Sequence, residues 1–280
     1  MTEINIGFVK GMIPKRNEES HKGDYGKVLL VCGCGFYRGA AALSTLGALR
    51  AGAGIACLAA EENVIASVAS IIPEAIFLPL PHDSELKSRA QSYSTCVLGC
   101  GKEDNKETLA TMKNVIINST GNVILDAGGL TSCKDELSLL NCLKGRCVVT
   151  PHFGEMAALL KKSLGEISEN PQKTAQEFSE KYGVIVVLKS HRTIVAAPNG
   201  GVFINTTGNA GLARGGSGDI LAGIIGGLSA CKIPLADAAK AGVFLHGLAA
   251  DRTAAKKSMQ GMLPSDILEE LPLLFLEMGL

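Results

Sequence analysis

The chain has 280 residues, and its 27 Lys and Arg balance its 27 Asp and Glu. A protein without net charge has no basic field to hold a nucleic-acid backbone or an anionic membrane, so neither partner is expected. Hydrophobic residues make up 46% of the chain, but aromatic residues only 4% and Trp is absent. We therefore expect a large core of Val, Ile, Leu and Ala.

The first residues do not form a signal peptide pattern, because Glu3 and Lys10 interrupt any apolar run. The longest uncharged apolar stretch, residues 220–231, is shorter than the about 20 residues of a spanning helix. A soluble cytoplasmic protein is expected. The nine cysteines include no Cys-x-x-Cys pair, which favours buried reduced thiols over a zinc site.

Short apolar runs alternate with helical patterns along the chain, which predicts βαβ units around a mainly parallel sheet. In chain order, the predicted strands are 28–32, 54–59, 95–98, 123–125, 147–150, 184–189, 193–197 and 202–205. The last two are separated by turn residues and predict a hairpin. Helices are expected at 40–50, at 220–230, and from Pro171, after an Asn170 cap, to a stop at Gly183. Because the strands are apolar throughout, helices should cover both sheet faces.

Glycine or polar residues follow five of these strands. The segments are Gly33-Cys34-Gly35, Gly99-Cys100-Gly101, Asp126-Ala127-Gly128-Gly129, Thr150-Pro151-His152 and Lys189-Ser190-His191. In an open parallel sheet, ligands bind outside the carboxyl ends of the strands. All five segments should therefore face one crevice.

The strongest signal is a glycine-rich segment, 205–219, directly before the predicted helix 220–230. Gly215, Gly216 and Gly218 leave the backbone around Ser217 open, so that amide donors at a helix start can converge on a phosphate. Asp219 would lie beside that phosphate and accept the proton of an attacking hydroxyl. The alternative is a tight turn with a helix-capping aspartate, but the number of glycines favours a functional site.

Three further candidates lie at the same crevice. His152 follows a strand and precedes a helix, and could be structural or catalytic. The segment Lys189-Ser190-His191-Arg192-Thr193 could bind nucleotide phosphates or form a solvated loop. Asp126 could orient Mg²⁺ through water, because this ion keeps several waters and few protein carboxylates.

Two other nucleotide-binding patterns are weaker. Residues 33–39 are similar to a dinucleotide fingerprint, but the spacing is one residue too long, although Glu61 and Glu62 lie near the place of a ribose partner. A Walker A loop is not formed, because Gly101-Lys102 is followed by Glu103.

Several motifs together resemble one known family. They are His21-Lys22-Gly23-Asp24-Tyr25-Gly26, Gly39-Ala40-Ala41, Ala48-Leu49-Arg50-Ala51-Gly52-Ala53-Gly54, Thr150-Pro151-His152-Phe153-Gly154-Glu155-Met156, Gly208-Asn209-Ala210-Gly211 and Gly215-Gly216-Ser217-Gly218-Asp219. In this order, from about Gly11 to Leu271, they are similar to the ADP/ATP-dependent NAD(P)H-hydrate dehydratases.

The resemblance implies a ribokinase-like α/β three-layer sandwich, with residues 1–280 as a single domain. It also implies repair of hydrated NADH or NADPH to the normal cofactor, with Mg²⁺ and with ADP, or ATP in some members, as phosphoryl donor. Bacterial members generally use ADP and release AMP and phosphate. A homo-oligomer, expected to be a tetramer, follows from the same resemblance. The epimerase domain often fused ahead of such chains is absent here, so any epimerase should be a separate chain.

By analogy, the family's positions map onto particular residues. Asp219 and Gly218 match the position that serves the hydrate hydroxyl and the transferred phosphoryl group. The segment 189–193 matches the nucleotide-binding loop, and Ala40, Gly101 and His152 match contacts to the hydrated dinucleotide.

The chain departs from the family pattern at three places. Cys100 stands where the family usually has Pro, Gly128 where it often has Asp, and Cys34 where it usually has Ser. Two alternatives remain on the sequence. One is a small-molecule kinase of the same superfamily that acts on a vitamin precursor, and the other is a nucleotide-binding protein without catalysis.

Overall fold

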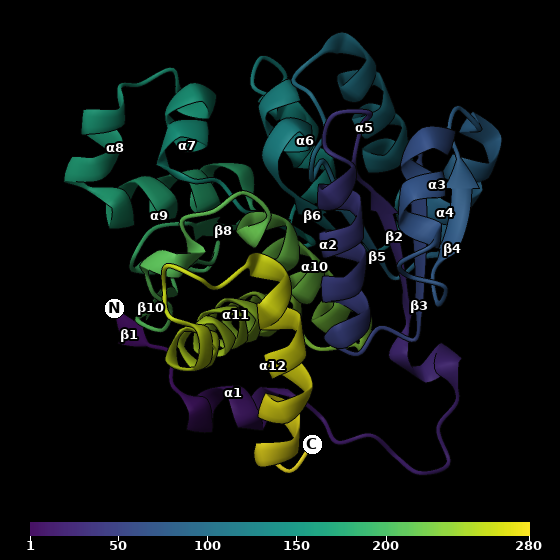
Figure 1. Cartoon of the computed structure of the whole chain (residues 1–280). Coiled ribbons are helices and arrows are strands. Elements are labelled where there is room, and N and C mark those ends of the chain that lie inside the picture. Colours follow the sequence, from purple (N-terminus) through teal and green to yellow (C-terminus); the bar gives the residue numbers. More distant parts are fainter.

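The computed structural model describes all 280 residues and contains one ten-stranded sheet, in the order β1-β10-β9-β8-β7-β6-β5-β2-β3-β4 (Figure 1). The strands are β1 (Thr2–Glu3), β2 (Lys27–Val31), β3 (Ile55–Ala60), β4 (Ile76–Pro79), β5 (Thr95–Leu98), β6 (Asn122–Leu125), β7 (Cys147–Val149), β8 (Ile185–Leu188), β9 (Thr193–Ala196) and β10 (Val202–Asn205). Only β9 is antiparallel to its neighbours, β8 and β10. The mainly parallel sheet predicted from the sequence is thus confirmed.

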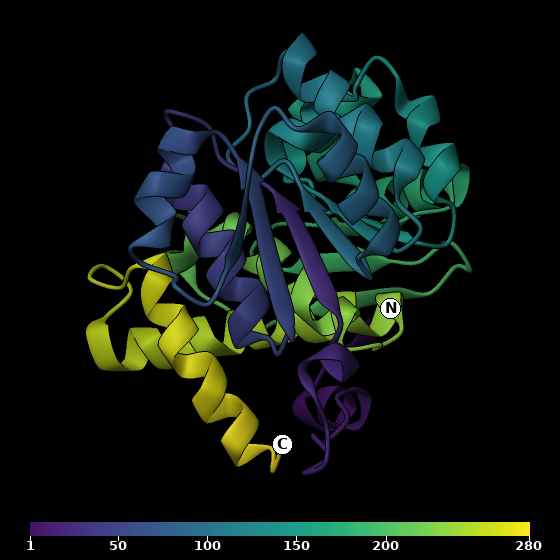
Figure 2. The same ribbon diagram turned by 90° about the vertical axis from the view of Figure 1, so that its right-hand side faces the viewer.

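Helices cover both faces of this sheet. The α-helices are α1 (Ile6–Met12), α2 (Arg38–Arg50), α3 (Glu62–Ala69), α4 (Asp83–Ser92), α5 (Lys106–Asn118), α6 (Ala127–Ser132), α7 (Phe153–Leu160), α8 (Leu164–Glu169), α9 (Pro171–Tyr182), α10 (Ser217–Ala230), α11 (Leu235–Lys257) and α12 (Pro264–Glu277). Short 3₁₀ helices lie at η1 (Lys22–Tyr25), η2 (Leu137–Leu143) and η3 (Ala210–Leu212). The teal helices of the middle of the chain and the green to yellow C-terminal helices lie on opposite sides of the sheet (Figure 2).

The side chains along each strand point alternately to the two faces of the sheet, and this divides the core into two layers. In β2, Val28 and Leu30 pack in the cluster that includes residues of α2, α10, α11 and α12. Leu29 and Val31 pack in the other cluster, with residues of α4, α5, α7 and α9. Successive side chains of a strand point to opposite faces, so a strand buried on both faces must be apolar at every position.

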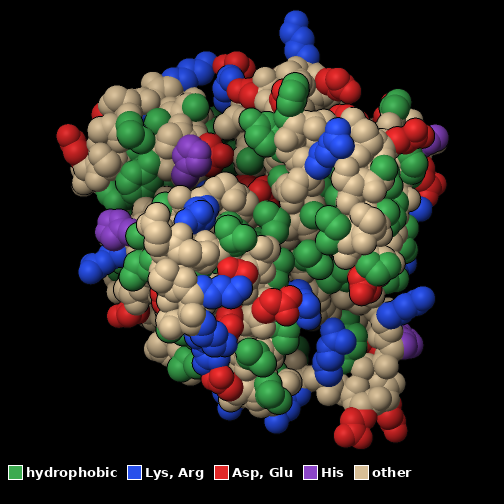
Figure 3. Space-filling view, viewed as in Figure 1, with side chains coloured by type: hydrophobic (Ala, Val, Ile, Leu, Met, Phe, Trp, Pro, Cys, Tyr) green, Lys and Arg blue, Asp and Glu red, His purple; other side chains and the backbone are tan.

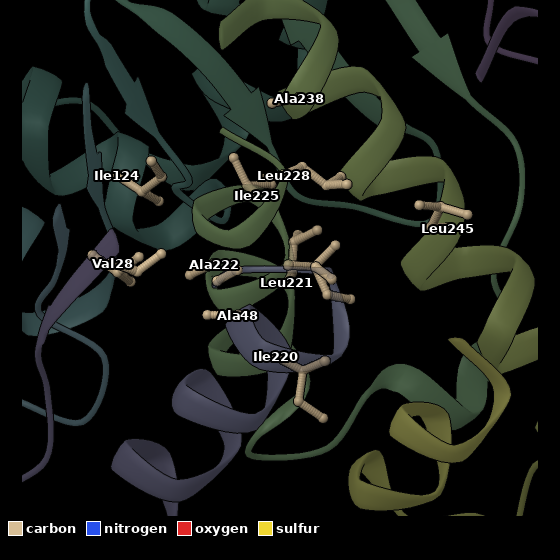
Figure 4. Close-up of a cluster of buried hydrophobic side chains, with 14 of the residues drawn as sticks. Val28, Ala48, Ile124, Ile220, Leu221, Ala222, Ile225, Leu228, Ala238 and Leu245 are labelled. Carbon is tan, nitrogen blue, oxygen red and sulfur yellow. The ribbon is translucent and has the colours of Figure 1, made fainter. Parts of the chain in front are cut away.

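Helix α10 occupies the centre of the first layer. Its apolar side chains, from Ile220 to Leu228, lie between Val28 and Ile124 of the sheet, Ala48 of α2 and residues of α11 (Figure 4). Glycines bring α10 and α2 close together, because a Cβ added to Gly223 would lie 2.2 Å from the Ser44 carbonyl oxygen. This packing fixes the position of the N-terminus of α10.

Eight predicted strands are present, with bounds shifted by at most one residue. The hairpin turn is closed by the Ala197 amide, which donates to the Gly201 carbonyl oxygen at 2.8 Å. Helix α9 begins at Pro171 and ends before Gly183 in the left-handed region, as predicted. Asn170 occupies the N-cap position, but its side chain makes no capping hydrogen bond.

Two strands were not predicted, and both lie at sheet edges. β1 has only two residues, too few for a periodic pattern. β4 ends at Pro79, a residue that indicates a strand end or edge because it cannot donate to the ladder.

Charged side chains of both signs are intermixed on the molecular face drawn in Figure 3, as expected for a chain without net charge. None of the helices combines the length and the apolar character that crossing a bilayer requires. All nine cysteines are free thiols. The six that the sequence placed in or beside apolar strand runs, Cys32, Cys34, Cys57, Cys96, Cys100 and Cys147, are buried.

Candidate active site

The carboxyl ends of five adjacent strands form the candidate site. β8, β7, β6, β5 and β2 are consecutive neighbours in the sheet and run parallel. The five segments that follow these strands therefore emerge at the same edge of the sheet, as the sequence predicted. Helix α10, which contacts β5, β6 and β2, brings its first turn to this edge.

Three side chains from different elements meet at this edge. Asp219 in the first turn of α10, Asp126 after β6 and Cys100 after β5 place their ligand atoms within 4.8 Å of one another. The Cys100 thiol donates a weak hydrogen bond to Asp126 Oδ2, with a sulfur to oxygen distance of 3.7 Å. Cys100 and Asp126 are buried and Asp219 is half-buried. Two carboxylates so close together in a low-polarity environment cannot both ionise easily.

Lys189 supplies the opposing charge. Its Nζ lies 2.8 Å from Asp126 Oδ1 and 3.7 Å from Glu155 Oε2. The Thr150 hydroxyl donates to the same Asp126 Oδ1 at 2.6 Å. Asp126 is therefore held on one oxygen, which leaves its Oδ2 on the side of Cys100.

These contacts set the protonation of the two central groups. Burial, followed by the negative charge of Asp126, raises the pKa of Asp219 to about 6, while Lys189 and Cys100 pull it down. Burial disfavours the charged form of Lys189, but Asp126 and Glu155 outweigh it and raise the lysine pKa. A carboxylate with a pKa near neutrality is suited to accept a proton.

The thiol in this cluster remains protonated. A hydrogen bond with the Cys32 thiol, together with burial, raises the pKa of Cys100 well above its usual value. Cys100 therefore acts at neutral pH as a weak hydrogen-bond donor rather than as a nucleophile.

The predicted anion hole lies at the start of α10. Gly216 is in the left-handed region with φ of 101° and precedes the first helical residue, Ser217. The amides of Gly215 and Gly216 make no backbone hydrogen bond, and those of Gly218 and Asp219 belong to the unpaired first turn of a helix. The Ser217 amide, in contrast, donates to the Arg214 carbonyl oxygen at 3.4 Å. Lys189 Nζ would lie 3.4 Å from a Cβ added to Gly218, so a cation lies beside these amides.

Two of the predicted substrate contacts lie next to each other. Gly101 has φ of 65°, and a Cβ added there would lie 2.5 Å from the Ala40 Cβ. Ala40 is in the first turn of α2, so the loop after β5 packs directly on the start of that helix.

His152 has a clear structural role in addition to its predicted one. Its Nδ1 accepts a hydrogen bond from the Glu155 amide at 3.1 Å, and the His152 amide donates to Glu155 Oε2 at 2.7 Å. This reciprocal capping box starts α7. The residue also forms a parallel bridge with Lys189, so His152 lies at the crevice with its side chain 58% exposed.

The predicted nucleotide-binding segment 189–193 divides into two parts. Lys189 joins the carboxylate cluster, whereas Ser190, His191 and Arg192 line a groove of about 550 Å³ beside the start of α9. Thr193 starts β9, and its hydroxyl donates to the Ser190 carbonyl oxygen at 3.0 Å. The turn is thus closed on itself.

Sequence reasoning gave no site role to Cys100, Thr150 or Glu155. Each of them contacts Asp126 or Lys189. Cys100 and Thr150 lie just after the ends of β5 and β7, which was the only signal for them, whereas Glu155 lies in the first turn of α7.

Known proteins that are similar to this chain identify its family and fold. A sequence model of the NAD(P)H-hydrate dehydratases matches residues 28–273. The chain belongs to the NAD(P)H-hydrate dehydratase family. It is 32% identical over 281 residues to the ADP-dependent (S)-NAD(P)H-hydrate dehydratase of Bacillus subtilis, covering 96% of this chain and 98% of that protein. The family predicted from the motifs is confirmed.

The chain spans about half the length of the bifunctional NAD(P)H-hydrate repair enzymes that it also matches, 53% in Moorella thermoacetica.

Solved structures of family relatives share the fold. The Bacillus subtilis ADP/ATP-dependent NAD(P)H-hydrate dehydratase, co-crystallised with ATP and Mg²⁺, superposes with a TM-score of 0.87 at 28% identity, covering 99% of this chain and 98% of that one. A ribokinase-like superfamily protein of Enterococcus faecalis gives 0.91 at 26% identity, covering 99% and 96%. The ribokinase-like three-layer fold is thereby confirmed, and the family is one of ADP/ATP-dependent enzymes.

Proposed function

We propose that the chain is an ADP-dependent (S)-NAD(P)H-hydrate dehydratase that converts hydrated NADH or NADPH to the normal cofactor, with AMP and phosphate as the other products. The observation that carries the proposal is Asp219, a carboxyl group whose pKa is raised to about 6. It lies in the first turn of α10 directly after unpaired glycine amides. A general base and a phosphate cradle are thus combined in one helix turn.

The hydroxyl oxygen of the hydrate is proposed to attack the terminal phosphorus of ADP, while Asp219 accepts the proton of this hydroxyl. The bond from that phosphorus to the oxygen of AMP breaks, and AMP leaves. The phosphorylated hydroxyl is a better leaving group than hydroxide, so the ring nitrogen of the hydrated nicotinamide expels phosphate. Loss of a ring proton then restores the cofactor, so that water has been removed at the expense of ADP.

The other residues bind and orient the reactants. The amides of Gly215, Gly216 and Gly218 with Ser217 are proposed to bind the phosphoryl oxygens as negative charge spreads over them. Lys189, fixed by Asp126 and Glu155, adds a positive charge beside them.

Two groups of residues are proposed as binding subsites. The segment Lys189 to Thr193 and Gly218 would bind the nucleotide. Ala40, Gly101, His152 and Asp219 would contact the hydrated dinucleotide. The adjacency of Ala40 and Gly101 at the mouth of the crevice supports the second subsite.

The residues present fit a magnesium ion held through water. Thr150 and Lys189 donate to Asp126 Oδ1. Oδ2 accepts only the weak bond from the Cys100 thiol, so it can also accept a hydrogen bond from a water of the ion, as Mg²⁺ prefers oxygen ligands and retains waters. When bound, the ion would neutralise charge on the donor phosphates.

We also propose a cytoplasmic location, a single domain over residues 1–280 and a homotetramer. Light scattering after size-exclusion chromatography tests the tetramer, which a mass of one or two chains would contradict.

The activity is tested by mixing the enzyme with hydrated NADH and ADP or ATP in the presence of Mg²⁺. Absorbance at 340 nm should return, and AMP should appear in step with it when ADP is used. Asp219→Asn should lower turnover at least a thousandfold, because the hydroxyl proton then has no acceptor, while ADP still binds within about threefold of the unmodified affinity.

The matched control is Asp83→Asn, the same change in the first turn of α4 at an exposed position, which should keep full turnover. A stable phosphorylated product without recovery of absorbance would instead indicate a small-molecule kinase. Nucleotide binding without turnover of any offered acceptor would indicate a binding protein. Full turnover by Asp219→Asn would remove this aspartate from the mechanism.

A further inference from the structure

Two neighbouring aromatic side chains at the candidate crevice are exposed to solvent and have no role in the proposed chemistry. Phe36 is 85% exposed and Tyr37 is 57% exposed. The chain has only eight Phe and four Tyr, and the one other exposed aromatic residue, Phe8, stacks its ring on Phe203. Exposed apolar side chains that gather at one place, rather than singly, indicate a binding surface.

The loop that carries both rings, residues 32–37, joins β2 to α2 and is fixed beside the carboxylate cluster. The Gly33 amide donates to the Cys100 carbonyl oxygen at 2.7 Å, and the Cys100 thiol belongs to that cluster. Within the loop, the Tyr37 amide donates to the Cys34 carbonyl oxygen at 3.0 Å. The backbone under the two rings is therefore held in place next to the candidate site.

Tyr37 also adjoins two residues that are proposed to contact the substrate. A Cβ added to Gly101 would lie 3.0 Å from the Tyr37 Cβ and 2.5 Å from the Ala40 Cβ. The Ala40 amide donates to the Tyr37 carbonyl oxygen at 3.3 Å. A substrate that touches Gly101 and Ala40 therefore comes within reach of the Tyr37 ring and of its neighbour Phe36.

The order of strands separates this loop from the proposed nucleotide-binding segment. Residues 32–37 follow β2 and residues 189–193 follow β8, and β5, β6 and β7 lie between these two strands in the sheet. Neighbouring strands are about 4.8 Å apart, which separates the two strand ends by roughly 19 Å. Asp219 lies between them, because its carboxylate is close to the residues after β5 and β6. The phosphoryl donor and the hydrated dinucleotide can thus approach Asp219 from opposite sides.

The chemistry of the dinucleotide decides which part of it the rings suit. Its hydrated nicotinamide ring contains saturated carbons, so it is not flat, and it must lie at Asp219 to react. Its adenine is a flat aromatic base at the other end of the molecule, beyond the two phosphates. Aromatic side chains stack on the faces of such bases. The adenine is therefore the part that suits two exposed rings at the edge of the crevice.

We propose that Phe36 and Tyr37 form the adenine subsite of the hydrated dinucleotide and bind this base by stacking. The adenylate half of the substrate is then held on the β2 side of the crevice while the hydrated ring lies at Asp219. The inference rests on the proposed function for the identity of the substrate. It gives the two residues no part in proton transfer and none in the binding of ADP.

The test compares two substrates as well as variants. At least one of Phe36→Ala and Tyr37→Ala should raise the KM for hydrated NADH about tenfold, the order expected for loss of a base stack, with kcat changed less than about threefold. Hydrated reduced nicotinamide mononucleotide has the same reacting ring but no adenine. Its KM, and the KM for ADP, should change less than about twofold in both variants. Titration calorimetry with hydrated NADH in the absence of ADP should give dissociation constants in the same order.

Aromatic replacements and an exposed control separate stacking from damage to the loop. Phe36→Tyr and Tyr37→Phe keep a ring and should keep the KM for hydrated NADH within about twofold. The matched control is Ile117→Ala in the last turn of α5, where the isoleucine is 64% exposed, and it should leave every KM unchanged. Thermal unfolding without ligand identifies any variant that fails to fold.

The possible failures differ in what they overturn. If both folded alanine variants keep the KM for hydrated NADH, or weaken the mononucleotide as much as the dinucleotide, the inference is wrong and the proposed function stands. An unchanged KM with a changed mass in light scattering would likewise overturn it and assign the rings to a contact between copies of the chain. An unmodified chain that binds hydrated NADH without converting it overturns the proposed function alone, and one that does not bind it overturns both.

Discussion

A single lysine side chain neutralises the carboxylates beneath the candidate site. Lys189 Nζ is 2.8 Å from Asp126 Oδ1, and Asp126 is only 1% exposed. A buried ion pair adds little net stability when it is intact, but removing one partner leaves an uncompensated charge in a low-dielectric environment. The lysine is therefore required for the fold as well as for the proposed phosphate site.

Lys189→Met should lower the free energy of unfolding by about 3–5 kcal/mol at pH 7, because Asp126 loses its counter-charge. Urea unfolding measures this value. Adding Asp126→Asn to Lys189→Met should recover part of the loss, since the stranded charge is then removed.

The control is Lys173→Met in α9, where lysine pairs with Glu177 at 3.7 Å and both side chains are exposed. This variant should lose less than about 1 kcal/mol of unfolding free energy. Equal losses at the two lysines would contradict the burial argument.

At the scale of single residues, the sequence indicated the proposed base, Asp219, but not the residues around it. Asp219 was predicted because glycines before an apolar helix indicate a phosphate cradle. Glu155 and Thr150 lie far from Asp126 and Lys189 in the chain, and only the order of strands in the sheet brings them together. Asp126 was predicted at a strand end, but its pairing with Lys189 depends on distant chain segments.

Among the elements, α10 has the most demanding packing, because its glycines let it approach α2. Gly223→Ala would place a Cβ 2.2 Å from the Ser44 carbonyl oxygen. The contacted atom belongs to the backbone of α2, so one of the two helices has to move, and we expect a loss of about 2–3 kcal/mol in unfolding free energy. Turnover should also fall, because a displaced α10 moves Asp219 and the glycine amides together.

Gly11→Ala in α1 is the matched control, since a Cβ there meets nothing within 4 Å. Alanine favours the helix over glycine, so this variant should be unchanged or stabilised by up to about 1 kcal/mol. Thermal and urea unfolding of both variants decide the comparison. A Gly223→Ala variant as stable as the Gly11→Ala one would mean that the two helices can separate without cost.

Element types were predictable where burial makes the pattern strong. The central strands are apolar at every position because helices cover both faces, and β2, β5 and β6 were found within one residue. The edge strands β1 and β4 were not found, because a two-residue strand has no period and Pro79 opposes a strand. The N-terminus of α10 was placed three residues late, since Ser217 and Gly218 are poor helix formers that tertiary packing holds in the helix.

For the whole molecule, the raised pKa of Asp219 links stability to pH. The pKa is about 6 in the folded chain and about 3.9 in an unfolded one. The folded state therefore binds this proton more tightly than the unfolded state does. The contribution of Asp219 to the free energy of unfolding is full below about pH 4 and is lost as the pH rises through 6.

Asp219→Asn carries no such charge and should be more stable than the unmodified chain above pH 6, by about 3 kcal/mol. The difference should disappear near pH 4. Urea unfolding at a series of pH values from 4 to 8 measures it. A constant difference across this range would show that folding does not shift the pKa of Asp219, and one that grows towards acid would show that folding lowers it.

The fold class could be predicted because apolar strands alternate with helical patterns, and the family because several motifs occur together in one order along the chain. The sheet order itself could not, since neither composition nor period says which distant strands pair. The position of β9, antiparallel between two strands, follows only from the turn residues of the hairpin.

Helix α10 is contributed after all ten strands of the sheet, yet it packs at their centre. During synthesis, β2, β5 and β6 leave the ribosome long before the helix that covers them. Until residues 217–230 emerge, the nascent sheet presents an uncovered apolar face, the kind of surface that chaperones bind and that promotes aggregation. Because Asp219, the proposed general base, is part of that same helix, a prematurely terminated product would lack both the cover of its core and its proposed reactive group.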